Sequence, residues 1–161
     1  MVCRHHHYSD FKAIVREILE VEAPLSEELF LKRIVWYFDR EKVTNVVQDA
    51  YEQQMYGYQR YGIIRRNGFL YLDDQKEIQF RVPGDIERDI KYIAPEELAA
   101  GMLEILKQSM TADRNGLYRA LAAQCGVTRV GRAVNEAMDA ALNVLLQNNS
   151  VVIDDYQVSL K

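Results

Sequence analysis

Residues 63–72 read IIRRNGFLYL, two apolar arms around the dipeptide Asn67-Gly68. Asparagine and glycine suit the two positive-φ positions of a type I′ turn, so this stretch predicts a tight β-hairpin. Arg65 and Arg66 stand beside the turn. A basic hairpin of this kind can contact DNA as a wing, or it can be an ordinary solvated turn.

The pattern around this hairpin recurs 87 positions away in the same chain. A gapless shift by 87 positions aligns apolar residues from one end to the other, for example Val15 with Met102, Leu19 with Leu106, Ile34 with Leu121, Phe38 with Cys125 and Tyr71 with Val158. Helix-cap residues coincide as well, because Ser26 falls on Asp113. Such a register predicts an internal repeat.

Each copy predicts three helices followed by a hairpin, the order of a winged helix-turn-helix. The expected ranges are 9–22, 26–38, 42–60 and the hairpin 63–72, then 95–108, 113–125, 128–148 and the hairpin 150–160. The alternation in residues 78–82 predicts a short linker strand between the copies. We therefore expect a mainly α fold with small β-hairpins (α+β), a tandem of two winged-helix-like units. Residues 1–8 would form a tail, 9–82 the first unit with its linker strand and 83–161 the second unit.

The two faces of the first hairpin follow from its two-residue turn. Cross-strand pairing groups Ile64, Arg66, Phe69 and Tyr71 on one face and Ile63, Arg65, Leu70 and Leu72 on the other. Because both faces are apolar, we expect the second group to cover the linker strand or the second copy, with only the arginine tip free. The second hairpin is expected to turn at Asp154 and Asp155.

Three stretches carry a family resemblance: VEAPLSEELFLKRI (21–34), RDIKYIAPEELAAGMLEIL (88–106) and LAAQCGVTRVGRAVNEAMDAAL (121–142). They resemble the uncharacterised domain at the C-terminal end of large bacterial superfamily I DNA helicase-like proteins of helicase-nuclease layout. The resemblance spans about residues 9–160 and implies an accessory module that acts with helicase or nuclease ATPase domains, in cis or in trans. It assigns no catalytic residue. This sequence has no GxxxxGK[ST] stretch and no nuclease-type carboxylate and lysine cluster.

Charge and composition restrict the class of protein. Twenty basic and twenty-four acidic residues give a net charge of −4, whereas a DNA-binding domain usually has a basic excess, so any DNA contact must be local. No apolar run approaches the roughly 18 residues of a membrane helix, and the first residues do not form a secretory signal. We therefore expect a cytoplasmic protein.

Neither cysteines nor histidines indicate a catalytic site. Cys3 and His5, His6 and His7 could bind zinc or nickel, but they are terminal and lack a partner motif, so we favour a disordered tail, native or left from a tag. Cys125 lies at an apolar helical position and is expected to pack in a core. We expect no enzyme activity, no cofactor and no metal.

Candidate DNA contacts follow from the winged-helix order, in which the third helix enters the major groove and the wing contacts the backbone. In the first copy, the polar residues of this kind are Lys42, Thr44, Asn45 and Gln48 on the helix and Arg65 and Arg66 on the wing. In the second copy, Arg129 and Arg132 could hold phosphates, or Arg132 could simply pair with Glu136 one turn later. The first copy is the better DNA candidate.

The sequence thus predicts a non-catalytic tandem winged-helix DNA-binding accessory module of a helicase- or nuclease-type protein. The alternative is a protein-interaction module, for which the Tyr-rich third helix offers an interface: Tyr51, Tyr56, Tyr58 and Tyr61. Steep salt dependence would distinguish DNA binding from an apolar protein interface.

Overall fold

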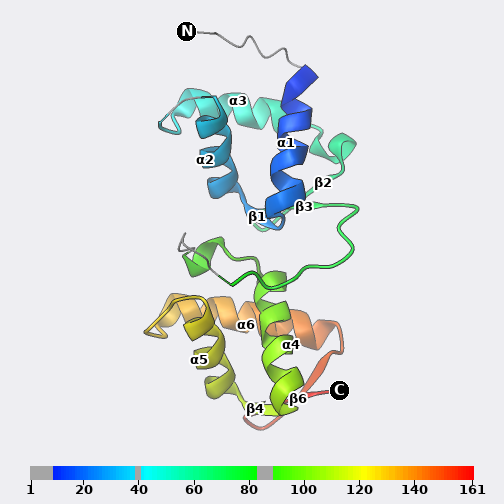
Figure 1. Cartoon of the computed structure of the whole chain (residues 1–161), viewed down its shortest axis with the longest axis vertical. Coiled ribbons are helices and arrows are strands. Elements are labelled where there is room, and N and C mark those ends of the chain that lie inside the picture. The colour runs from blue at the N-terminus through cyan, green and yellow to red at the C-terminus, as the bar shows by residue number, and fades with distance from the viewer. Residues whose placement is uncertain (1–8, 39–40, 83–88) are drawn as a thin grey trace. The chain divides into compact units, whose positions relative to one another are not determined.

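The computed structural model describes residues 9–38, 41–82 and 89–161. The chain divides into two compact units, Met1–Lys76 and Glu77–Lys161. Both units have the same element order of helix, strand, helix, helix and hairpin (Figure 1). Each is α+β, mainly helical with one small three-stranded antiparallel sheet.

The first unit contains three α-helices and one sheet. Its elements are α1 (Ser9–Glu22), β1 (Leu25–Ser26), α2 (Glu27–Tyr37), α3 (Asn45–Met55), the 3-10 helix η1 (Tyr58–Tyr61), β2 (Ile63–Arg66) and β3 (Phe69–Leu72). The Ser26 side chain accepts a hydrogen bond from the Leu29 backbone N–H and caps α2. We expected the third helix to reach residue 60, but α3 ends at Met55 because Gly57 takes a left-handed conformation (φ 80°).

The first hairpin has the register that its turn predicts. Ile63 pairs with Leu72 and Arg65 with Leu70, around Asn67 and Gly68 at positive φ. Our expectation that this face covers the linker strand or the second copy was wrong. Ile63, Leu70 and Leu72 instead join the core of their own unit, with side chains from α1 and α2. The short strand β1, which pairs with β3, was not predicted.

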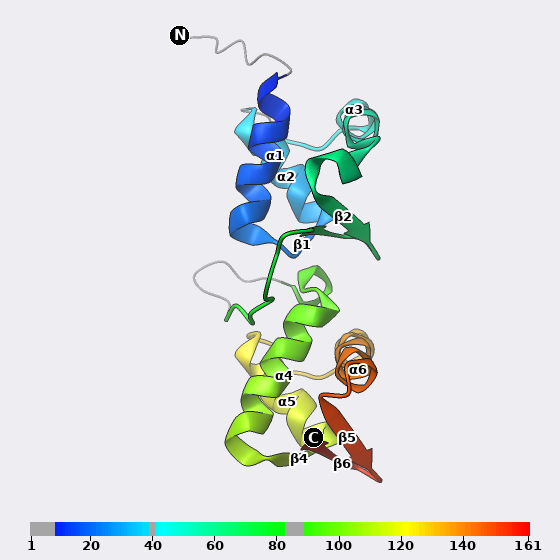
Figure 2. The ribbon, with the colours of Figure 1, turned by 90° about the vertical axis from the view of Figure 1, so that its right-hand side faces the viewer.

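The second unit repeats this architecture. Its elements are the 3-10 helix η2 (Ile90–Tyr92), α4 (Pro95–Ser109), β4 (Thr111–Asp113), α5 (Arg114–Gln124), α6 (Arg132–Gln147), β5 (Val151–Asp154) and β6 (Gln157–Leu160). The strand order β4-β6-β5 matches β1-β3-β2 of the first unit. In Figure 2, α3 and α6 are seen end-on while α1 and α4 run nearly upright, so in each unit the third helix crosses the first steeply.

The offset between the copies changes at the second hairpin. Glu27–Tyr37 and Arg114–Gln124 begin and end 87 residues apart, as the gapless shift predicts. The second hairpin, however, turns one residue later than expected, because Asp154 is the last residue of β5 and not the first residue of the turn. The exposed fractions agree with an offset of 88 in the hairpin, because Ile64 (45% exposed) then corresponds to Val152 (42% exposed). One extra residue between the third helix and the hairpin explains this difference.

The linker segment 77–82 differs from expectation in two ways. It forms no strand, and it belongs to the second unit rather than the first. Phe80 packs in the core of the second unit. Arg81 donates hydrogen bonds to Glu97, which is fully buried, from its backbone N–H and its guanidinium. A side chain in place of Gly101 would collide with the Phe80 ring, so the helix and this segment pack at close range.

None of the helices in the described ranges is long and apolar enough to cross a membrane.

Candidate functional site around Arg65

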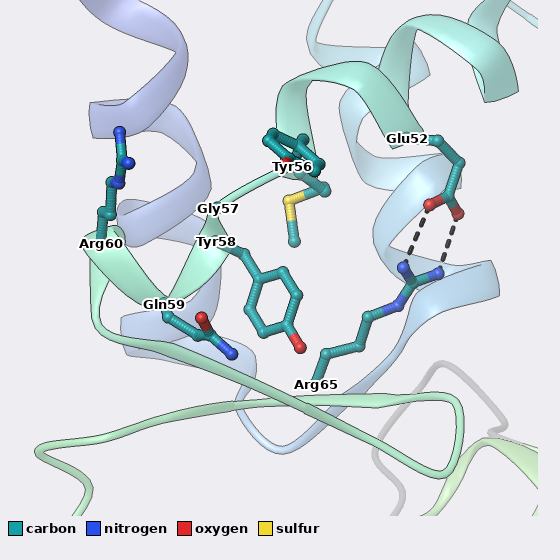
Figure 3. A pocket seen from close by; sticks show the side chains of 8 residues that line it. Glu52, Tyr56, Gly57, Tyr58, Gln59, Arg60 and Arg65 are labelled. Atoms are coloured by element: carbon teal, nitrogen blue, oxygen red, sulfur yellow. Dashed lines mark hydrogen bonds and ion pairs between the residues drawn. The ribbon is translucent and has the colours of Figure 1, made fainter.

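Arg65 is the centre of an ion-pair network in the first unit. Its Nε donates to Glu27 Oε1 at 2.9 Å, while Nη1 and Nη2 donate to the two carboxylate oxygens of Glu52 at 3.0 and 2.8 Å. Figure 3 shows the paired bonds to Glu52. These bonds, first to Glu27 and then to Glu52, raise the pKa of Arg65. The expectation of a free arginine tip was therefore wrong for Arg65.

Tyr51 extends this network into the core. Its hydroxyl donates to Glu27 Oε2 at 3.0 Å, and only 4% of the residue is exposed. Burial, followed by the neighbouring charge of Glu27, raises the pKa of the phenol, which stays protonated. The network joins the hairpin strand β2, the first residue of α2 and the middle of α3, and we call Glu27, Tyr51, Glu52 and Arg65 the polar knot.

The polar knot is a poor place for a phosphate. Two carboxylates face one guanidinium, so its formal charge is −1 before any ligand arrives. Between Asn45 and Met55, α3 carries Asp49 and Glu52 and neither lysine nor arginine. A DNA backbone placed on this helix would meet like charge, which opposes the phosphate attraction that dominates DNA affinity.

The other DNA candidates of the first unit lie on its surface. Lys42, Thr44, Asn45 and Gln48 are all exposed around the beginning of α3. Thr44 also acts as the helix cap, because its hydroxyl accepts a hydrogen bond from the Val47 backbone N–H. Arg66 is exposed and its guanidinium lies 4.7 Å from the centre of the Tyr71 ring.

In the second unit, Arg129 precedes α6 and Arg132 is the first residue of that helix, and both are exposed. Arg132 Nε donates to Glu136 Oε1 at 2.7 Å, the one-turn pair that the sequence offered as its alternative role. With 92% of its side chain exposed, Arg132 is held only weakly by this pair.

The four tyrosines proposed for a protein interface differ widely in exposure. Tyr51 is in the polar knot, and Tyr58 and Tyr61 are half-buried against the core of the first unit. Tyr56 is 91% exposed, directly after α3. Of this set, Tyr56 therefore has the most apolar surface available to a partner.

Two open hollows adjoin the pair of Arg65 and Glu52. One, of about 440 Å³, is drawn in Figure 3, where Tyr58 and Gln59 lie between Arg60 and Arg65. The other, of about 340 Å³, lies between α2 and the beginning of α3, and we call it the α2–α3 hollow. It is lined by Glu27, Glu28, Leu31, Lys32, Val43, Gln48, Tyr51, Glu52 and Arg65.

Exposed apolar residues are frequent from the last turn of α2 to the first turn of α3. Their exposed fractions are 62% for Trp36, 44% for Tyr37, 41% for Phe38, 37% for Val43 and 76% for Val46. This group was not predicted, because the repeat aligned Phe38 with Cys125, which is buried. The consecutive aromatic residues WYF at 36–38 were the available signal.

The second unit has a related network without an arginine on its hairpin. Arg114 and Asp139 stand 87 positions after Glu27 and Glu52, and they pair directly at 2.6 Å. The Tyr118 hydroxyl donates to Asp139 at 2.6 Å. Burial, followed by that hydrogen bond, raises the pKa of Tyr118 to about 12. The same bond, more than the one from Arg114, lowers the pKa of Asp139.

Within the described residues, His, Cys, Asp and Glu side chains form no group of three that could hold a metal ion. The candidate ligands Cys3, His5, His6 and His7 lie outside the described residues. Cys125 is buried at the end of α5 and packs in the core of the second unit.

No protein-family model, curated protein or solved structure matches this chain. The resemblance to helicase-associated domains therefore stays a prediction that depends on the sequence motifs alone.

Proposed function

We propose that this chain is a non-catalytic tandem winged-helix module that docks a protein partner through its first unit. The repeated order of three helices and a hairpin, with matching sheet orders, supports the winged-helix assignment. The resemblance suggests that the partner belongs to a DNA-processing ATPase or nuclease, linked in cis or bound in trans.

The observation that carries this proposal is the pairing of Arg65. The sequence offered this residue to DNA, but Glu27 and Glu52 already bind its guanidinium. A phosphate would have to compete with two carboxylates that are held in place. A protein partner therefore fits the charge of the first unit better than a DNA backbone does.

The exposed apolar residues support a protein partner. Aromatic side chains are enriched at the centres of protein interfaces, and tryptophan and tyrosine are frequent hot spots. Trp36 is 62% exposed and Tyr56 is 91% exposed, so neither side chain is part of the core. Next to Trp36, Tyr37 and Phe38 are also exposed and their ring centres lie 5.6 Å apart, and exposed apolar patches mark interaction sites in soluble proteins.

DNA contact by the second unit is the second candidate. Arg129 and Arg132 are exposed at the beginning of α6, the third helix of that unit, where a winged helix would meet the major groove. This candidate would involve few phosphates, and its affinity would fall with added salt.

Photocrosslinking tests which class of partner the first unit binds. Benzoylphenylalanine replaces Trp36, or Glu17 on α1 as the control position, in cells that produce the chain, and adducts are formed by irradiation. We expect a discrete protein adduct from position 36 that resists nuclease, and none from position 17. Adducts from position 36 that nuclease removes would refute protein docking and favour DNA.

A DNA titration gives the complementary measurement. Fluorescent single-stranded, duplex and forked DNA are titrated with the chain at low and at raised salt. We expect weak binding that Arg129→Ala with Arg132→Ala reduces and that Arg65→Ala does not. Strong binding that depends on Arg65 would contradict the assignment of this residue to the polar knot.

A further inference from the structure

The α2–α3 hollow combines unbalanced charge with an apolar lining. Its charged lining residues are Glu27, Glu28 and Glu52 against Lys32 and Arg65, three carboxylates and two cations, so its formal charge is −1. The two cations are already bonded inside the hollow, Lys32 to Glu28 at 2.9 Å and Arg65 to the polar knot. The excess charge that a ligand meets is therefore negative.

Apolar surface lies beside these carboxylates. Leu31, Val43 and Tyr51 line the hollow, and Val43 keeps 37% of its surface exposed. Trp36 follows Lys32 by four residues on α2, so the two side chains lie on the same stripe of the helix. Trp36, which is 62% exposed, therefore lies one helical turn along α2 from a residue that lines the hollow.

We propose that the α2–α3 hollow binds a basic amphipathic segment of a partner protein. A lysine or arginine of that segment would lie beside Glu28 and Glu52, while its apolar face would cover Val43 and Trp36. This inference rests on the proposed function and specifies the chemistry of the partner.

Charge complementarity selects this occupant over two others. A nucleic acid brings phosphates to a hollow whose net charge is already negative. A second copy of the chain brings a net charge of −4. A segment that carries cations and leucine-like side chains matches both the carboxylates and the apolar lining.

A synthetic amphipathic peptide of leucine and lysine, about 14 residues or four helical turns long, is the probe. The chain has a single tryptophan, so intrinsic fluorescence reports on Trp36 alone when the peptide contains none. We expect a saturable shift of the Trp36 emission with the leucine-lysine peptide. A leucine-glutamate peptide of the same length should produce no shift.

Variants of opposite charge make the test specific to the hollow. Lys32→Gln removes a cation and should tighten peptide binding about threefold, whereas Glu28→Gln removes a carboxylate and should weaken it about threefold, as expected for exposed charge pairs. Val43→Asn removes apolar lining and should also weaken binding. Glu17→Gln on α1 changes the net charge as Glu28→Gln does, and should leave the affinity unchanged.

The ordering of these variants decides the outcome. If Glu17→Gln weakens binding as much as Glu28→Gln, or if Lys32→Gln does not tighten it, the attraction is diffuse and the inference is overturned. Absence of peptide binding overturns it as well. In that case a nuclease-resistant protein adduct at position 36 would still support docking by the first unit, so the two proposals fail separately.

Discussion

Replacing Arg65 with alanine should destabilise the first unit, although the residue lies beside an exposed turn. The change leaves the carboxylates of Glu27 and Glu52 close together without their shared cation. Glu27 has only 16% of its side chain exposed, so water can replace the guanidinium there only in part. An unpaired carboxylate with limited access to water carries a desolvation penalty.

The size of the effect follows from the exposure of the partners. A hydrogen bond to a charged group contributes about 1.5–3 kcal/mol when buried, and an exposed ion pair contributes about 0–1 kcal/mol. The bond to Glu27 is nearer the first case, while the pair with Glu52, 46% exposed, is nearer the second. We expect Arg65→Ala to lower the free energy of unfolding by about 2 kcal/mol, and Glu52→Gln added to it to restore part of the loss.

Urea unfolding followed by Trp36 fluorescence measures this loss, because the single tryptophan lies in the first unit. The matched control is Arg66→Ala. Arg66 is exposed and contacts the Tyr71 ring, so its loss should cost about 0.5 kcal/mol. Equal, negligible effects of both variants, together with loss of DNA binding in Arg65→Ala, would refute the structural role of Arg65.

Four other predictions concern packing, pH and catalysis. Gly101→Ala should destabilise the second unit by about 1–3 kcal/mol in thermal unfolding, because its Cβ would lie 2.6 Å from a buried leucine methyl. Its matched control is Gly116→Ala, whose Cβ would make only ordinary contacts and which should be neutral or stabilise by up to about 1 kcal/mol. Leu70→Asp places a charge at a fully buried position and should cost several kcal/mol, seen as a loss of far-UV circular dichroism without urea. The pKa of Asp139 is lowered, so the stabilisation that it contributes should be lost as the pH falls below the ordinary Asp value. The pKa of Tyr118 is raised to about 12, so its contribution should be lost as the pH rises from about 10 to 12. Tyr118→Phe should reduce the alkaline loss of folded protein, measured by circular dichroism. The isolated chain should release no phosphate from ATP and should cut no DNA, with or without Mg²⁺.

Most of the fold could be predicted because its signals are local. The dipeptide Asn67-Gly68 fixes the turn of the first hairpin, and Ser26 and Asp113 cap the helices that follow them. The strands β1 and β4 were missed because two or three residues are too few to show alternation. The end of α3 was missed because a single glycine, Gly57, terminates a pattern whose tyrosines continue beyond it.

The site was harder to predict because its contacts are distant in sequence. Glu27 and Glu52 are 38 and 13 residues from Arg65, and nothing in a local window indicates that a hairpin arginine and two helix carboxylates meet. The repeat register also concealed the exposed aromatic residues after α2, since it assigned Phe38 to the core. Apolar periodicity predicts which face of a helix is buried, but not where the helix leaves the core.

Comparison of the two networks explains why the first hairpin is basic. In the second unit, the position of Glu27 is taken by Arg114, which pairs directly with Asp139, and the hairpin position of Arg65 is taken by Ile153. In the first unit both helix positions are acidic, so a cation must come from elsewhere, and Arg65 on β2 supplies it. A hairpin cation is thus present in the unit where both of these helix positions are acidic, and absent in the unit where one of them is an arginine. The carboxylates of its own unit account for Arg65, the basic residue that suggested a DNA-binding wing, and the exposed surface of α2 and α3 stays available for the protein partner that we propose.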